Sequence, residues 1–198
     1  KQGERSMSWE PLKEAVISLT KLTARACSEQ ETMEGARPIL SKLIESSSWL
    51  DAAYKEPHPE FYQQYLLYAD PNDRFSVVSF VWGPGQSTPI HDHTVWGLVG
   101  VLEGSEKCQR YQRNSMGSVE PTGPEEIYLP GDIDCVSPSV GDIHTVANAL
   151  PNQPSISIHI YGANIGKTSR HVFKPGVVKP VDFISGYNPL PAPNLGLI

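Results

Sequence analysis

The chain has 198 residues, of which 39% are hydrophobic and 19% charged, a composition that is ordinary for a globular protein with one sizeable core. The formal net charge is −6, basic residues do not cluster, and no apolar run approaches the ~20 residues of a membrane span, so neither nucleic acid nor a membrane is an expected partner. Cys27, Cys108 and Cys135 lack C-x-x-C spacing, and no secretory apolar segment opens the chain, which together favour the reducing cytoplasm.

The first 60 residues are predicted to be helical. Ser8 is expected to cap a first helix that has Pro11 in its first turn, and the apolar residues follow helical spacing: Leu12, Ala15, Val16, Leu19 and Leu22. A second helix is predicted over residues 30–46, where Pro38 leaves a break open, and a third short turn over residues 49–54. Residues 1–7 are polar and expected to be loose. We expect residues 1–60 to pack against one end of a β barrel as part of the same domain; a separate regulatory domain is the alternative.

From residue 61 onward the sequence predicts short strands separated by turn residues. Residues 62–69 and 75–82 are expected to form a hairpin, and residues 114–124 a loop. Further strands are predicted over residues 95–102, 106–112, 127–129, 134–137, 144–147 and 155–161. Many short strands with frequent turns are typical of a sandwich or barrel. Residues 61–198 are therefore predicted to form a mainly β barrel, with residues 183–187 in a C-terminal segment that wraps over it.

Histidines gather in two stretches of the predicted barrel. His91 and His93 are two residues apart, so in a strand both side chains leave the same face and can point at one atom. Pro89, just before them, suits the entrance of a strand. A third histidine, His144, follows a turn at Gly141 and begins another apolar run. Together the three indicate a metal site at His91, His93 and His144.

The two stretches resemble the two sequence motifs of the cupin superfamily. The matching residues are Gly85, His91, His93 and Gly104 in the first motif and Gly141, His144 and Asn148 in the second. Gly97 stands where the first motif has a glutamate ligand, which leaves three neutral imidazoles. In this respect the chain resembles the thiol dioxygenases of the cysteine dioxygenase family, which hold ferrous iron, Fe(2+), with three histidines. The resemblance implies a cupin jelly-roll barrel and ferrous iron as the cofactor, although three histidines also bind zinc.

Residues 155–161 alternate between isoleucines and polar side chains. The polar side chains are Ser157, His159 and Tyr161, which share one face of the predicted strand and follow each other at ~6.8 Å. On this pattern alone, an edge strand with a polar outer face is slightly favoured. The resemblance implies the opposite, because thiol dioxygenases carry a Ser, His, Tyr relay that faces the iron. The tyrosine hydroxyl then points into the site, oriented by His159 and Ser157.

Two further residues bear on the substrate. Animal-type cysteine dioxygenases bind the substrate carboxylate with an arginine, and Gln64 stands at the corresponding position. Glutamine there resembles the bacterial group that prefers 3-mercaptopropionate, in which Arg170 is the matching basic residue. Without the resemblance, a solvent-exposed arginine is equally expected. Gly97 also stands where animal enzymes carry the cysteine that cross-links to the active-site tyrosine, so no cross-link to Tyr161 is expected.

The resemblance implies an iron(II)-dependent thiol dioxygenase that adds both atoms of O2 to the sulfur of a small thiol carboxylate and gives a sulfinic acid. 3-Mercaptopropionate is the favoured substrate. A cysteine dioxygenase that converts L-cysteine to cysteine sulfinate is the alternative, and mercaptosuccinate stays open. So do a different metal cupin enzyme, such as an isomerase or a carbon-cleaving dioxygenase, and a cupin that binds metal as a sensor without turnover. The thiol and O2 are the expected partners, and the sequence does not indicate an oligomeric state.

Overall fold

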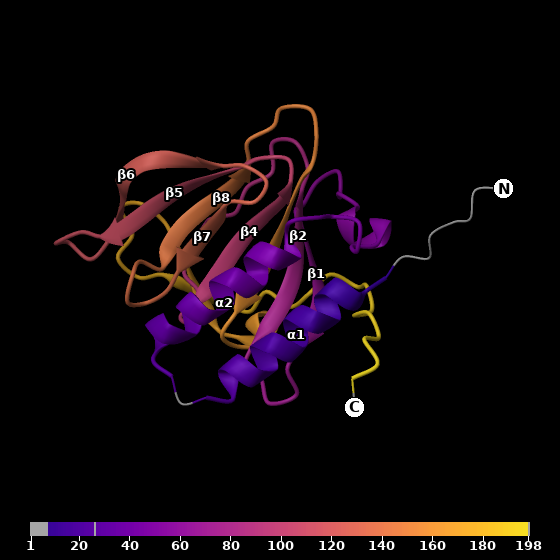
Figure 1. Cartoon of the computed structure of the whole chain (residues 1–198). Helices are drawn as coiled ribbons and strands as arrows, with labels where there is room; N and C mark the ends of the chain where they lie inside the picture. Colours follow the sequence, from indigo (N-terminus) through magenta and orange to yellow (C-terminus); the bar gives the residue numbers. More distant parts are fainter. Residues whose placement is uncertain (1–7, 26, 198) are drawn as a thin grey trace.

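Two helices lead into a run of short strands in the computed structural model, which describes residues 8–25 and 27–197. The helices are α1 (Glu10–Thr23) and α2 (Glu29–Leu43), followed by the 3₁₀ turn η1 (Ala52–Lys55). The strands are β1 (Gln63–Ala69), β2 (Ser76–Trp82), β3 (Ile90–His91), β4 (Gly97–Glu103), β5 (Glu106–Arg113), β6 (Val119–Tyr128), β7 (Ile133–Val136), β8 (Ile143–Asn148), β9 (Ser155–Tyr161), β10 (Arg170–Phe173) and β11 (Val181–Phe183), with the 3₁₀ turn η2 (Ile165–Lys167) before β10. The strands make up most of the regular structure (Figure 1).

The strands form two antiparallel sheets. One has five strands in the order β1-β2-β9-β4-β7, and the other has six in the order β11-β10-β3-β8-β5-β6. Side chains of β2, β8 and β9 meet between the sheets, where Phe80 and Trp82 belong to the same apolar cluster as Val146 and Tyr161. The interior is therefore shared by both sheets, as in a jelly roll. The predicted mainly β fold, a cupin jelly-roll barrel with helices packed against it, is confirmed.

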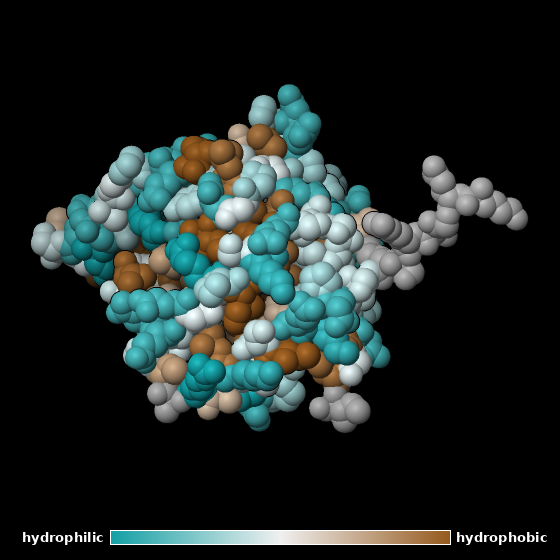
Figure 2. Space-filling view, viewed as in Figure 1, coloured by the Kyte–Doolittle hydropathy of each residue, from teal (hydrophilic) through white to brown (hydrophobic). Residues whose placement is uncertain are grey.

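The helices cover the outer face of the five-stranded sheet (Figure 1). Leu12, Leu19 and Leu40 are fully buried there, in one apolar cluster with Leu98 and Ile158 of the sheet. Close packing needs a glycine in β4, because a Cβ atom at Gly100 would lie 2.9 Å from Ile44 Cδ1. Figure 2 shows this side of the molecule, on which hydrophilic side chains alternate with apolar ones. Among the described residues, no helix is long and apolar enough to cross a membrane.

The helix boundaries differ from the prediction in detail. The residue that caps α1 is Trp9 rather than Ser8, although Ser8 Oγ still accepts the Glu10 N–H at 3.2 Å. Helix α2 begins at Glu29, one residue before the predicted start, and Ser28 caps it in a capping box with Glu31. It continues through Pro38, whose exposed position lets water satisfy the carbonyl that loses its partner. Residues 1–7, which were expected to be loose, lie outside the described part of the chain.

Two strands, β10 and β11, were not anticipated from the sequence, and β6 was predicted only at its end, over residues 127–129. The predicted loop over residues 114–124 is wrong in its second half, because β6 begins at Val119 and pairs with β5. Pro121 and Pro124 hide this strand from a pattern search, yet both are tolerated because β6 is the edge of its sheet. Strands β10 and β11 are only a few residues long and carry no alternation.

Candidate metal centre

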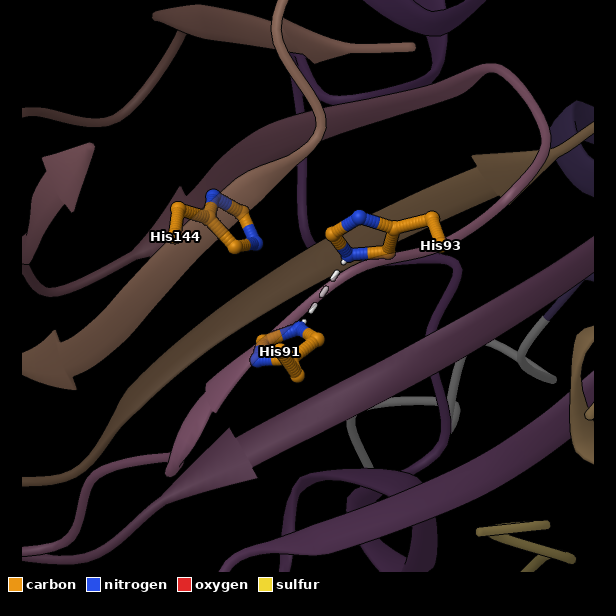
Figure 3. A group of neighbouring side chains, drawn as sticks. All are labelled: His91, His93 and His144. Atoms are coloured by element: carbon orange, nitrogen blue, oxygen red, sulfur yellow. Dashed lines mark hydrogen bonds between the residues drawn. The ribbon is translucent and has the colours of Figure 1, made fainter. Parts of the chain in front are cut away.

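The three predicted ligands lie together inside the barrel. His91 ends β3, His144 is its cross-strand partner in β8, and His93 follows two residues after His91. A ring nitrogen from each lies within 4.8 Å of the others, and all three side chains are buried (Figure 3). The same-face argument holds only in part, because His93 lies beyond the end of β3. Its ring is brought back toward the other two by a turn in which Thr94 has a φ of 62°.

Hydrogen bonds fix which nitrogen of each ring faces the centre. His91 Nδ1 lies 3.0 Å from the carbonyl oxygen of Pro89, and His93 Nδ1 lies 3.1 Å from that of Asp142. A carbonyl oxygen only accepts, so both Nδ1 atoms carry the proton and both Nε2 atoms present a lone pair. Burial and the neighbouring imidazoles hold the pKa of His91 and of His144 well below the usual value, so these two rings stay neutral.

The contact between the Nε2 atoms of His91 and His93 fits a bound cation. His91 Nε2 and His93 Nε2 are 3.1 Å apart, the contact drawn in Figure 3. With both protons on Nδ1, two lone pairs face each other across this distance, an arrangement that repels until a positive ion lies between them. Neutral imidazoles with the second nitrogen engaged as a donor are the form in which histidine binds metals. The donor set therefore fits a divalent transition metal.

Two residues that the sequence analysis did not single out hold the ligands in place. The Asp142 carboxylate accepts the backbone N–H of His93 at 3.0 Å and of Thr94 at 2.9 Å, and also lies 3.0 Å from His93 Nδ1. Cys108 Sγ lies 3.5 Å from His144 Nδ1, and burial raises the pKa of the Cys108 thiol to about 12. Asp142, two residues before His144, could have been noticed as a carboxylate within the second motif. No sequence motif pointed to Cys108 as a neighbour of His144.

The predicted relay lies on the inner face of β9, beside the histidines. Ser157 Oγ is 2.7 Å from His159 Nε2, and His159 Nδ1 is 2.8 Å from the Tyr161 hydroxyl. Strand β9 lies between β2 and β4, so the edge-strand interpretation is wrong. The Phe80 ring stacks on His159 at 3.8 Å between centroids, and Trp82 Nε1 donates to Ser157 Oγ at 3.4 Å. Burial lowers the pKa of His159 and raises that of Tyr161, so both are neutral.

A pocket of about 290 Å³ opens beside the histidines. Its walls bring together the predicted site residues Gln64, His91, His144, His159, Tyr161 and Arg170, with aromatic rings of Tyr62, Phe80, Trp82 and Phe183. Ser157 and His93 are not among the residues that line the pocket.

Arg170 is buried, with 5% of its surface exposed, rather than solvent-exposed. It donates to Ser185 Oγ at 2.9 Å and lies over the Phe183 ring at 4.7 Å, while its Nε has no partner among the described residues. Burial lowers the pKa of Arg170, and no carboxylate in the described part of the chain pairs with it. A buried guanidinium with a free N–H is a ready anchor for an anion.

Gly97 occupies the predicted place beside the tyrosine. It is the cross-strand partner of Tyr161, and a Cβ atom there would lie 2.7 Å from the tyrosine ring. The ring lies against the backbone of β4, in space that a side chain would fill. The chain offers no sulfur at this position.

Comparisons with known proteins identify a family that the chain matches. Residues 39–171 match the model of the family described as cysteine dioxygenase type I. Cysteine dioxygenase type 1 of Danio rerio is 27% identical over 94 residues, which are 46% of this chain and 46% of that protein. The alignment thus spans about half the length of the curated relative.

Solved structures of low identity are also similar. A protein with a double-stranded β-helix domain from Klebsiella pneumoniae has 22% identity and a TM-score of 0.45, over 62% of this chain and 92% of that one. A cupin superfamily protein from Desulfitobacterium hafniense has 15% identity and a TM-score of 0.42, over 55% of this chain and 84% of that one.

Proposed function

The chain belongs to the cysteine dioxygenase type I family, and from this premise we propose that it is an iron(II)-dependent thiol dioxygenase. The observation that carries the proposal is the convergence of three imidazoles, without a carboxylate, beside a pocket that also contains Tyr161 and Arg170. The partners are a small thiol and O2. The three cysteines are unpaired, which supports a reducing compartment, the cytoplasm, as the place of action.

The reaction balances without a further reductant. A thiolate and O2 give a sulfinate, in which both oxygen atoms are bonded to sulfur, the S–H proton is released, and four electrons pass from sulfur to oxygen. When bound, ferrous iron supplies the charge that favours the thiolate and the electrons that allow O2 to react. His91, His93 and His144 would hold it.

The remaining residues bind and orient the substrate. Arg170 takes the carboxylate through its free Nε–H, and the aromatic walls of the pocket exclude water. Tyr161 directs its hydroxyl toward the reacting sulfur and oxygen, while His159 holds the other side of that hydroxyl. Ser157 in turn holds His159, so the position of the hydroxyl is fixed by two buried hydrogen bonds.

The lining of the pocket favours 3-mercaptopropionate over L-cysteine. Both thiols carry a carboxylate for Arg170, but cysteine adds an ammonium group. No aspartate or glutamate is among the described residues that line the pocket, so the ammonium would lose its hydration without gaining a counter-charge. Gln64 offers an amide in place of a second cation. L-cysteine remains the second candidate because the family match extends over 39–171.

The test is oxygen uptake by the ferrous-loaded protein with 3-mercaptopropionate, L-cysteine and mercaptosuccinate side by side, with the sulfinate product quantified. We expect 3-mercaptopropionate to give the highest kcat/KM. Zinc-loaded protein is the matched control and should consume no oxygen. If L-cysteine is better by about tenfold, a gap of ~1.4 kcal/mol, the substrate assignment is wrong. If iron binds and none of the thiols is oxidised, the protein is a metal-binding cupin without this activity.

A further inference from the structure

Glu106, at the start of β5, is buried in the barrel without a hydrogen bond. Only 2% of its surface is exposed, and neither carboxyl oxygen has a partner among the described residues. Burial raises the pKa of the Glu106 carboxyl, and the nearby Ser157 hydroxyl lowers it. The two groups do not meet the geometry of a full hydrogen bond. A buried, unsatisfied carboxyl costs stability, so its presence next to Ser157 needs a reason.

The other titratable groups around Glu106 are engaged elsewhere. Glu106 borders a small cavity. Its other titratable neighbours there are Lys107 and Cys108 on β5, Tyr128 on β6 and Asp134 on β7, and the remaining lining residues are valines of β4 and β8. Asp134 pairs with Arg110, Tyr128 donates to Glu126 at 2.5 Å, and Cys108 faces His144. Lys107 reaches outward to Glu125 at 4.0 Å. Ser157, on β9, is therefore the neighbour with which the Glu106 carboxyl can form a hydrogen bond.

The relay has two possible directions for its protons. His159 is neutral, so it carries one ring proton and shares it with either Ser157 or Tyr161. If the proton is on Nδ1, His159 donates to the Tyr161 oxygen, accepts from Ser157, and leaves the Tyr161 proton free for the pocket. If the proton is on Nε2, His159 donates to Ser157, and the Tyr161 proton is used within the relay.

We propose that Glu106 is a positioning residue that ends the chain Glu106–Ser157–His159–Tyr161 and, as a neutral acid, sets its direction. The carboxylic acid donates to Ser157 Oγ, Ser157 then donates to His159 Nε2, and His159 Nδ1–H donates to Tyr161. The Tyr161 proton is left pointing into the pocket. The inference rests on the proposed function only for the use of that proton; the direction itself is a property of the folded chain.

The charge state of Glu106 agrees with this direction. Burial raises the pKa of Glu106 to about 8, so the group is a neutral donor at pH 7. Above that pKa the carboxylate only accepts, and Ser157 would turn its proton toward it. The relay would then reverse, with the His159 proton on Nε2. The folded chain is thus expected to lose the productive direction as pH rises through about 8.

The direct test reads the tautomer of His159 by long-range ¹H–¹⁵N correlation in the full chain loaded with zinc, which does not broaden the signals. At pH 7 we expect the proton on Nδ1 in the wild type and in Glu106→Gln, which keeps an N–H donor. In Glu106→Leu the population of this tautomer should fall about tenfold relative to the other. Glu120→Gln, an exposed change on β6, is the control.

A pH titration of the wild-type protein tests the same tautomer switch in His159. Raising the pH from 7 to 9.5 should convert His159 to the Nε2 tautomer, and Glu106→Gln should abolish that conversion. In the ferrous protein, Glu106→Leu should lower kcat about tenfold with KM unchanged, and Glu106→Gln should remain active above pH 8. An unchanged His159 tautomer in Glu106→Leu or in the alkaline wild type would falsify the proposal. If the tautomer switches but no thiol is oxidised, the role of Glu106 stands and the proposed function fails.

Discussion

The two faces of β9 are equally buried and chemically opposite. Ile156, Ile158 and Ile160 are at most 2% exposed on the outer face, and Ser157, His159 and Tyr161 are at most 3% exposed on the inner face. The isoleucines join the apolar cluster under α1 and α2, where each contributes roughly 1.5–3 kcal/mol by leaving water. The polar residues gain little by burial, because each must replace its bonds to water. Burial alone therefore does not mark an apolar core, and the reaction proposed above gives the polar inner face a role.

The largest effect is expected from removing a metal ligand on the inner side. In His144→Ala, metal affinity should fall by more than about 100-fold, because even changes behind a ligand cost 10- to 100-fold. Turnover should be lost, whereas the far-UV circular dichroism and the melting temperature of the metal-free protein should stay close to wild type. Metal content after equilibrium dialysis is the measurement. Full iron occupancy in this variant would contradict the assignment of His144.

The outer face should respond in the opposite way. Ile158→Ala removes a fully buried side chain and leaves a cavity under the helices, so the free energy of unfolding should fall by about 2–5 kcal/mol. The number of metal ions bound per chain at saturation should not change. Urea denaturation followed by tryptophan fluorescence measures the loss. Val181→Ala, on exposed β11, is the control and should change stability by no more than ~0.5 kcal/mol; an equally small loss in Ile158→Ala would break the comparison.

Arg170 tests whether a buried polar group in the pocket serves binding rather than stability. Arg170→Met should lower kcat/KM for 3-mercaptopropionate by about 10- to 100-fold, the equivalent of a hydrogen bond to a charged group worth roughly 1.5–3 kcal/mol. The melting temperature should not fall, because an unpaired buried cation is removed. Cysteamine, a thiol without a carboxylate, is the matched substrate and should be affected little. Equal losses for both thiols would remove Arg170 from the carboxylate site.

The smallest effect is expected from a single hydroxyl of the relay. Tyr161→Phe should retain the metal and lose about fivefold in rate, or lose coupling between O2 consumed and sulfinate formed, since one hydrogen bond is worth about 1 kcal/mol. Oxygen-electrode traces compared with product assays measure both quantities. Unchanged rate and coupling would count against the relay. The intact mass of the wild type should also show no thioether, because Gly97 faces the ring.

The sequence allowed the prediction of those features that repeat or match a motif locally. The alternation in residues 155–161 gave β9 at its observed bounds, and the spacing of His91, His93 and His144 gave the cluster of three buried imidazoles. Features that depend on distant partners could not be found. Whether the polar face of β9 points inward depends on β2 and β4, which lie beside it in the sheet but far away in the chain. On its own the pattern slightly favoured an edge strand, which is wrong because β9 lies between β2 and β4.

The residues that support the centre were missed for the same reason. Asp142 acts through His93, and Glu106 faces a serine 51 positions later, so neither shows a local pattern. Helix α2 passes through Pro38 because one lost hydrogen bond is outweighed by the buried side of the helix. The first part of β6 was hidden by its prolines and by its polar composition, since pairing with β5 is what makes this segment a strand.

The prolines of β6 have a consequence for how the protein behaves at high concentration. An edge strand is a template on which another chain can add a strand and begin a fibre. At this edge, Pro121 and Pro124 offer no N–H to an incoming backbone, and Glu120 and Glu125 add negative charge on exposed positions. On the other sheet, Asn188 bonds both backbone groups of Gln64 in edge strand β1 and so occupies them. These two edge strands, β6 and β1, are thereby poor starting points for amyloid-like growth.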